Sequence, residues 1–205
     1  MNYIDLSHPI TNSISTYPSD PKVLIIKEKE IDKDRTLLHS FKMGTHTGTH
    51  LDAPAHIINN AKTLDEFTLD SFCGKTIKVD KNNFKSLLNL EKKIDGVIYD
   101  TGWYKHFFNP TKFFNKERPL IAQELLEVID NLNLKFFGCD LPSVDKSGSK
   151  SKKVHNKLLG QDIIIYEALA NLNKLPKLEI FDFFGFPLAF KNLDGSPVRA
   201  VASLL

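Results

Sequence analysis

The stretch "HTGTHLDAPAH" runs from His46 to His56 and is the most informative part of the sequence. It contains three of the chain's seven histidines and one aspartate within eleven residues. Its threonines, glycine and proline make it a poor helix. In an extended chain alternate side chains point the same way, and the four candidate groups all stand at even-numbered positions: His46, His50, Asp52 and His56. We therefore predict an extended segment that directs three imidazoles and one carboxylate to one side.

Such a cluster has three uses in proteins. Neutral imidazoles combined with a carboxylate bind zinc, manganese or iron(II). A histidine and an aspartate can also act as acid and base without a metal, and histidines can be ordinary hydrogen-bonded side chains. The convergence of four such groups favours a metal site, and its remaining ligands must come from elsewhere in the chain.

Candidates for these ligands lie late in the sequence. Glu167 ends the apolar run "DIIIYE", and a carboxylate in such a strand needs a partner, which a metal ion would supply. His155 precedes it, across a short predicted helix. The spacing alone leaves open whether either residue reaches the first cluster. Asp140 and Asp145 are candidates for orienting ligand imidazoles or for capping a loop.

The bulk composition is that of an ordinary globular protein, with 41% hydrophobic and 25% charged residues among 205. A net charge of +2 gives no electrostatic case for nucleic acid. The two cysteines, Cys73 and Cys139, make neither a disulfide framework nor a CxxC zinc site. Because the start "MNYIDLSHPI" lacks the features of a secretory signal and no apolar run approaches the ~20 residues that span a bilayer, we expect a cytoplasmic protein without a membrane partner.

Predicted strands outnumber predicted helices. Runs rich in β-branched and aromatic residues predict strands over residues 3–7, 23–31, 37–44, 75–80, 96–101, 135–140, 162–167 and 198–205. A helix is predicted over residues 119–133, where Pro119 suits the first turn and apolar residues recur at helical spacing. A shorter helix is expected near Val154. The class is therefore α/β with a mostly β core, in a single domain that spans residues 1–205.

The stretch "HTGTHLDAPAH" closely resembles the HxGTHxDxPxH signature of the metal-dependent cyclase family, which includes bacterial kynurenine formamidases and isatin hydrolases. The resemblance extends along most of the chain, through "YIDLSHPI", "STYPSDP", "DTGW", "GCDLPSVD", "HNKLLGQDIIIYEALANL" and "PLAFKNLDGSPVRAVA". It implies a fold of the swivelling β/β/α type, in which a few helices flank a mixed, largely antiparallel sheet. It also implies assembly as a homodimer or homotetramer.

The resemblance implies a set of metal ligands. A first ion would be bound by His46, His50 and Asp52. The carboxylate of Asp52 would bridge to a second ion, which is held by His155 and Glu167. The implied cofactor is Zn²⁺, as one or two ions, with Mn²⁺ as the alternative.

The implied activity is metal-dependent hydrolysis of a small amide, foremost the conversion of N-formyl-L-kynurenine to L-kynurenine and formate. His56, without a bond to the metal, would be the proton shuttle. Tyr17 stands where kynurenine formamidases usually place a tryptophan that packs on the aromatic substrate, so Tyr17 is the substrate-binding candidate. The alternatives are a cyclic amide or lactone hydrolase, a cyclase of the same family, or a catalytically silent homologue that binds a metal or ligand.

Overall fold

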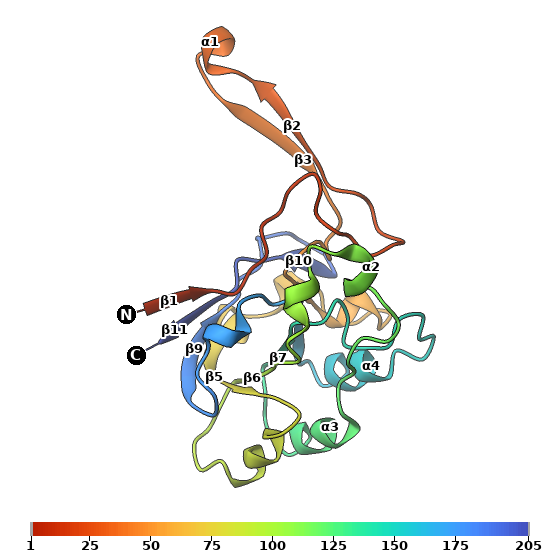
Figure 1. Cartoon of the computed structure of the whole chain (residues 1–205), viewed down its shortest axis with the longest axis vertical. Helices are drawn as coiled ribbons and strands as arrows, with labels where there is room; N and C mark the ends of the chain where they lie inside the picture. The colour runs from red at the N-terminus through yellow and green to blue at the C-terminus, as the bar shows by residue number, and fades with distance from the viewer. Residues whose placement is uncertain (1, 205) are drawn as a thin grey trace.

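The computed structural model describes residues 2–204, and its centre is a mixed sheet of nine strands (Figure 1). The three pairings between β5, β6, β7 and β8 are parallel, and the other five are antiparallel. This arrangement confirms the predicted α/β class with a mostly β core. The strands, in sheet order, are β1 (Asn2–Asp5), β11 (Val201–Leu204), β9 (Ile180–Phe184), β5 (Cys73–Val79), β6 (Gly96–Tyr99), β7 (Phe136–Cys139), β8 (Ile164–Glu167), β4 (His50–Asp52) and β10 (Gly195–Pro197).

The helices are few and short. Four are α-helical: α1 (Ile31–Asp34), α2 (Pro110–Phe113), α3 (Gln123–Ile129) and α4 (Lys153–Leu159). Six are 3-10 turns: η1 (Pro54–His56), η2 (Leu64–Glu66), η3 (Leu69–Phe72), η4 (Phe84–Asn89), η5 (Trp103–His106) and η6 (Leu172–Lys174). Within residues 2–204, no helix has the length and apolar character needed to cross a bilayer.

Two apolar clusters cover the two faces of the sheet, and strand β8 shows how they divide it. Ile165 packs into the cluster that α3 and α4 cover, whereas Ile164 and Tyr166 pack into the cluster on the other face. Because side chains alternate along a strand, Glu167 points to the same face as Ile165. The last residue of β8 therefore lies on the face that α4 covers.

The predicted helix over residues 119–133 is too long. Helix α3 begins at Gln123, because Ala122 before it has extended backbone angles, and it ends at Ile129. Ile121 lies outside the helix yet is buried in the α3-side cluster. This residue is apolar because it packs in the core, and not because it lies on the buried face of a helix. The shorter helix expected near Val154 is confirmed as α4.

All eight predicted strands overlap an observed strand, but two strands were not predicted at all. β10 contains glycine, serine and proline, which disfavour strands. It can form because it is an edge strand. Pro197 lacks a backbone N–H group, and at the edge of the sheet this leaves no second neighbouring strand without a hydrogen-bond donor. β9 is a phenylalanine-rich run in which only Phe181 and Phe183 are buried, so its alternation appears in burial and not in residue type.

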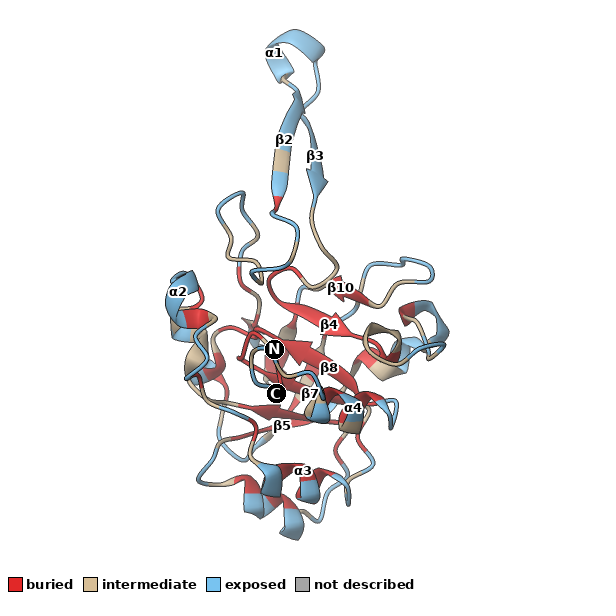
Figure 2. Ribbon diagram, turned by 90° about the vertical axis from the view of Figure 1, so that its right-hand side faces the viewer, coloured by how far each residue is buried: buried red, intermediate tan, exposed pale blue. Residues whose placement is uncertain are grey.

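The two predicted strands over residues 23–31 and 37–44 form a separate hairpin. Strand β2 (Leu24–Lys29) pairs antiparallel with β3 (Leu38–Lys42), and α1 connects them. Neither strand joins the nine-stranded sheet. The hairpin projects from the body of the molecule, and nearly all of its surface is exposed (Figure 2). We call residues 24–42 the arm.

The substitution Phe136→Ala should lower the free energy of unfolding by about 3–5 kcal/mol, as for other large-to-small core changes. The ring is fully buried and packs against Tyr166 and Phe183. Denaturant titration measures the loss. Leu69→Ala, at a side chain that is 72% exposed, is the control and should change stability little. Equal losses in the two variants would contradict the central position of Phe136.

Candidate metal centre

The segment from His46 to His56 is not one extended strand, which corrects the prediction from its spacing. Only residues 50–52 form a strand, β4. His46 lies in a turn before β4, where Gly48 has a left-handed φ of 65°, and His56 ends the turn η1 that Pro54 begins. Glycine and proline thus end the strand on either side. His50 and Asp52 nevertheless share one face of β4, as the alternation predicts.

Two further residues reach this face from distant parts of the sequence. β4 pairs antiparallel with β8, and the register places Glu167 directly opposite His50. Helix α4 packs against β8 and presents His155. Nε2 of His155 lies 3.6 Å from Oδ2 of Asp52 and 3.5 Å from Oε1 of Glu167. The structure therefore brings together the first cluster, His155 and Glu167.

Nε2 of His50 and the two carboxylates beside it have no hydrogen-bond donor or cation between them in the neutral tautomer of this histidine. Its Nδ1 donates to the carbonyl oxygen of Gly48 at 2.8 Å, which leaves Nε2 facing Oδ1 of Asp52 at 3.4 Å and Oε2 of Glu167 at 3.6 Å. In the neutral tautomer Nε2 is an acceptor that faces two acceptors. Oδ2 of Asp52 is buried and has no hydrogen-bond partner among the described residues. A cation at this position would satisfy all of these atoms.

The spacing of the donor atoms also fits a metal ion. Zinc bonds of ~2.0–2.1 Å to nitrogen and oxygen place neighbouring ligand atoms of a tetrahedral site ~3.4 Å apart. The contacts of His50 and His155 with the two carboxylates measure 3.4–3.6 Å. Among residues 2–204, two sets of donor atoms lie close enough to hold an ion, and both include Asp52: His46, Asp52 and His56, and His50, Asp52 and Glu167.

A second layer of contacts fixes the ligands on the α4 side. The carboxylate of Asp145 accepts hydrogen bonds from the backbone N–H groups of Val154 and His155 and, at 2.7 Å, from Nδ1 of His155. It therefore holds the start of α4 and one imidazole together. The backbone N–H of Val144 donates to Glu167, and the buried guanidinium of Arg118 donates to the carbonyl groups of Ser143 and Asp145.

Of the two aspartates considered for orienting an imidazole, only Asp145 contacts one. Asp140 instead accepts hydrogen bonds from the side chain and backbone of Thr101 and from the backbone of Tyr104. It therefore caps the loop after β6. The sequence offered both roles for both residues, and the fold assigns one role to each.

Asp194, which lies between His46 and His56, was not among the residues predicted from the sequence. Its Oδ2 accepts from Nε2 of His46 at 2.8 Å and from Nδ1 of His56 at 3.3 Å. A Cβ atom on Gly195 would lie 2.6 Å from Cε1 of His46, so this position has room only for glycine. An aspartate followed by glycine is typical of a turn, so the sequence indicates a turn at Asp194 and Gly195 and not a contact with the histidines. The β10–β4 pairing, which places Gly195 opposite Asp52, brings both residues to the centre.

Burial and charge act against each other on the ionisable groups. Burial disfavours the charged form of His46, but the charge of Asp52 and hydrogen bonds to Asp194 and Asp52 raise its pKa to about 10. Burial likewise opposes protonation of His155, but Asp145, followed by Asp52 and Glu167, raises its pKa to about 11. The metal-free centre is therefore held together by protonated imidazoles beside ionised carboxylates.

The carboxylates respond in the opposite direction. Burial and the neighbouring Asp52 raise the pKa of Glu167, but the imidazoles of His155 and His50 outweigh them and bring it to about 2. Burial also opposes the ionisation of Asp52, while His46, His155 and His50 hold its pKa well below the usual range. Both carboxylates are thus ionised at neutral pH and available as ligands.

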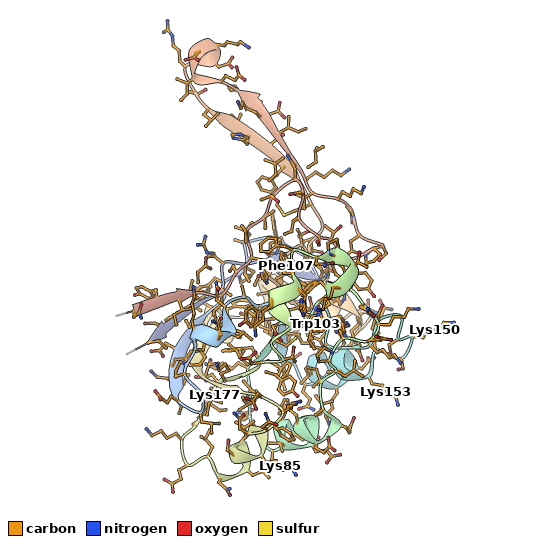
Figure 3. The ribbon with its side chains drawn as sticks, viewed as in Figure 1. Lys85, Trp103, Phe107, Lys150, Lys153 and Lys177 are labelled. Carbon is orange, nitrogen blue, oxygen red and sulfur yellow. The ribbon has the colours of Figure 1, made fainter. Side chains whose placement is uncertain are left out.

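A cleft of about 240 Å³ opens over the centre. Its walls include Tyr17, Ser143 and Lys152, together with the histidines of the cluster. The Tyr17 ring packs edge-on against Phe114, and its hydroxyl lies 3.4 Å from Oγ of Ser147. Tyr17 therefore lies where a molecule in the cleft would meet it. Lys150, in the loop before α4, and Lys153, the first residue of α4, lie near the outer edge of the molecule (Figure 3).

The fold and the cluster together define an α/β protein with a candidate metal centre on one face of a mixed sheet. The chain belongs to the cyclase family, because the family model described as "Putative cyclase" matches residues 4–146. The family predicted from the HTGTHLDAPAH stretch is thereby confirmed.

The chain is similar over nearly its whole length to two bacterial proteins named kynurenine formamidase. The protein from Bacillus anthracis is 30% identical over 209 residues, which cover 97% of this chain and 96% of that protein. The protein from Bacillus thuringiensis subsp. konkukian (strain 97-27) is 29% identical over 206 residues, with the same coverage. Isatin hydrolase A from Ralstonia solanacearum has a similar fold, with a TM-score of 0.84 at 21% identity, covering 98% of this chain and 91% of that chain.

Binding of a divalent ion should release protons, because the ion competes with those on His46 and His155. With pKa values of about 10 and 11, both imidazoles are protonated at neutral pH. If both become ligands, about two protons leave, and the apparent affinity rises up to ~100-fold per pH unit near neutrality. Calorimetric titration with Mn²⁺ in buffers of different ionisation enthalpy counts the protons. An affinity independent of pH would contradict the arrangement.

Proposed function

We propose that this protein is a metal-dependent hydrolase of a small amide, and that its first candidate activity is hydrolysis of N-formyl-L-kynurenine to L-kynurenine and formate. The observation that carries the proposal is the buried carboxylate of Asp52, which is shared between two sets of metal-binding side chains below a small cleft. The names of the full-length relatives support the formamide substrate.

We propose that the centre holds one or two Zn²⁺ ions, with Mn²⁺ as the alternative. The ligands would be His46, His50 and Asp52 for one ion, and Asp52, His155 and Glu167 for the other. Imidazole and carboxylate donors suit both metals. When bound, a divalent ion would lower the pKa of water and polarise a carbonyl group.

His56 is the proposed proton shuttle, which takes a proton from the attacking water and returns it to the leaving amine. Its side chain is partly exposed, at 25%, and its Nδ1 faces Asp194 at 3.3 Å. The Nδ1–H group donates a hydrogen bond to Asp194, which leaves Nε2 as the nitrogen that exchanges protons with substrate. General acid–base groups of this kind contribute ~10²–10⁴-fold to the rate.

A cyclic amide or lactone is the second candidate substrate, and Tyr17 is the feature that favours it. The residue has a smaller ring than tryptophan at the cleft and carries a hydroxyl that can donate a hydrogen bond. Hydrolysis of a ring amide by the same residues would give one product with an amine and a carboxylate.

We further propose that residues 1–205 act as one hydrolase domain in a cytoplasmic homodimer or homotetramer whose partner is a small-molecule substrate, without nucleic acid or membrane. Size-exclusion chromatography and cell fractionation test the assembly and the location. The weak net charge of +2 supports the absence of a nucleic-acid partner.

His56→Ala should reduce turnover by about 10²-fold or more while the metal content stays unchanged, because in the proposed assignment His56 moves protons and the ion is held by other residues, although His56 lies within one of the two donor sets. Asp52→Ala should instead lose the metal, since it removes the carboxylate that both donor sets share. Elemental analysis beside a turnover assay separates the two effects. His106→Ala, at a histidine outside the cluster, is the control. Loss of metal from His56→Ala would make His56 a ligand and end its assignment as the shuttle.

A substrate screen tests the reaction itself. The chelated protein should be inactive, and Zn²⁺ or Mn²⁺ should restore hydrolysis of N-formyl-L-kynurenine and of simple formanilides. Isatin, a cyclic amide, tests the second candidate in the same assay. Turnover of isatin alone would favour the cyclic substrate. Failure of the metal-loaded protein on every amide and lactone would contradict the hydrolase and favour a silent binding protein.

A further inference from the structure

One cationic side chain lines the cleft over the candidate metal centre and has no part in the reaction proposed above. Besides the histidines and Glu167, the cleft is lined by Tyr17, Ser19, Asp20, Pro142, Ser143 and Lys152. Lys152 is therefore the only lysine or arginine among the described residues that line the cleft. Its side chain is partly buried, whereas the nearby Lys150 and Lys153 are exposed near the outer edge of the molecule (Figure 3). A few polar groups in such positions fix the orientation of a ligand.

The backbone around Lys152 fixes where its side chain begins. Residue 152 has φ 43° and ψ 47°, the left-handed conformation that a residue with a Cβ atom rarely adopts. The side-chain amide of Asn156 donates hydrogen bonds to the carbonyl oxygens of Ser151, at 3.0 Å, and of Lys152, at 2.9 Å. Helix α4 begins at the next residue and carries His155. The start of this helix therefore holds Lys152 in a fixed position relative to the candidate ligand His155.

The positive charge of Lys152 is not used by the protein itself. Among residues 2–204 its ammonium group forms no ion pair and no hydrogen bond, although Glu167 also lines the cleft. Glu167 instead faces Nε2 of His50 and of His155 and accepts a hydrogen bond from the backbone N–H of Val144. The charge of Lys152 is therefore available to a molecule in the cleft.

A second cation lies behind the same wall of the cleft. The buried guanidinium of Arg118 donates to the carbonyl oxygens of Ser143 and Asp145, and Ser143 lines the cleft. Among residues 2–204 Arg118 also has no ion pair with a carboxylate. Two cations without an acidic partner on one side of a small cleft favour an anionic group of the ligand there.

We propose that Lys152 determines specificity by binding a carboxylate group of the substrate, at the end remote from the amide bond that is cleaved. The inference rests on the proposed amide hydrolysis and adds a substrate class, an amide that also carries an α-amino acid group. A hydrogen bond between an ammonium group and a carboxylate is stronger than one between neutral groups. Asp20, the acidic residue of the cleft outside the candidate centre, matches the charge of the α-ammonium group. A neutral cyclic amide offers neither charge.

Two formamides that differ by one group test the role of Lys152. N-formyl-L-kynurenine carries an α-carboxylate, and N-formylkynuramine is the same molecule without it. In the Zn²⁺-loaded protein, Lys152→Met should lower kcat/KM for the first relative to the second by about tenfold or more, the scale of one lost hydrogen bond to a charged group. The loss should appear in KM rather than in kcat, because the carboxylate lies away from the reacting bond. Lys152→Arg should restore part of the preference.

Lys153→Met is the matched control for this experiment. Lys153 is the next residue in the chain and has the same charge, but it is exposed and does not line the cleft. The control variant should keep the wild-type ratio of kcat/KM between the two formamides. A Lys152→Met variant that keeps this ratio, or that loses activity on both formamides equally, would overturn the inference.

A binding experiment separates this inference from the proposed function. Calorimetric titration of the Zn²⁺-loaded protein with L-kynurenine and with kynuramine, which lacks the carboxylate, measures recognition without turnover. The wild type should bind L-kynurenine about tenfold more tightly, and Lys152→Met should remove this difference. Hydrolysis of neither formamide would contradict the proposed function. A wild type without preference for L-kynurenine, or a Lys152→Met variant that retains the preference, would instead overturn the role of Lys152.

Discussion

The buried carboxylate of Asp52 is the constraint on which the rest of the site depends. Its side chain is 1% exposed, and Oδ2 has no hydrogen-bond partner among residues 2–204. An uncompensated charge in a protein interior costs several kcal/mol, so polar groups that can face the carboxylate must be held around it. Three separate parts of the fold do this: the turn before β4 brings His46, β4 itself brings His50, and α4 brings His155. Each depends on strand or helix packing that lies outside the site.

The same arrangement supplies positive charge to the two carboxylates from the protein's own side chains. Asp52 lies close enough to Glu167 to raise its pKa, and burial disfavours the charged form of both carboxylates, so the neighbouring imidazoles are needed to keep both ionised. Protons on His46 and His155 supply that charge in the metal-free protein. Binding of a metal ion would then replace the protons on His46 and His155, while the fold already holds these side chains in place. The register of the sheet positions these side chains, and Asp145 holds α4 and His155 through one carboxylate.

The sequence predicted those parts of the fold and site that depend on local patterns. Eight strands were found from residue type, and Glu167 was singled out because a carboxylate at the end of an apolar strand needs a partner. His155 could be assigned only from the family resemblance, since its approach to Asp52 depends on how α4 packs on β8. Asp194 was missed because its role depends on the pairing of β10 with β4, between segments far apart in the chain. Local propensity contains no information about such a pairing.

Among the three imidazoles proposed as metal ligands, His46 is the one that the core supports least. Its side chain is 17% exposed, against 6% for His50 and 2% for His155, and it lies in a turn rather than in a strand or helix. Asp194 and Gly195 compensate for this, because one binds the imidazole and the other leaves room for its ring. The strand that carries Gly195 is a weak edge strand, and the turn that carries His46 leads directly from the arm. The position of His46 thus depends on two peripheral segments, whereas His50 and His155 are held by a strand and a helix that pack against β8.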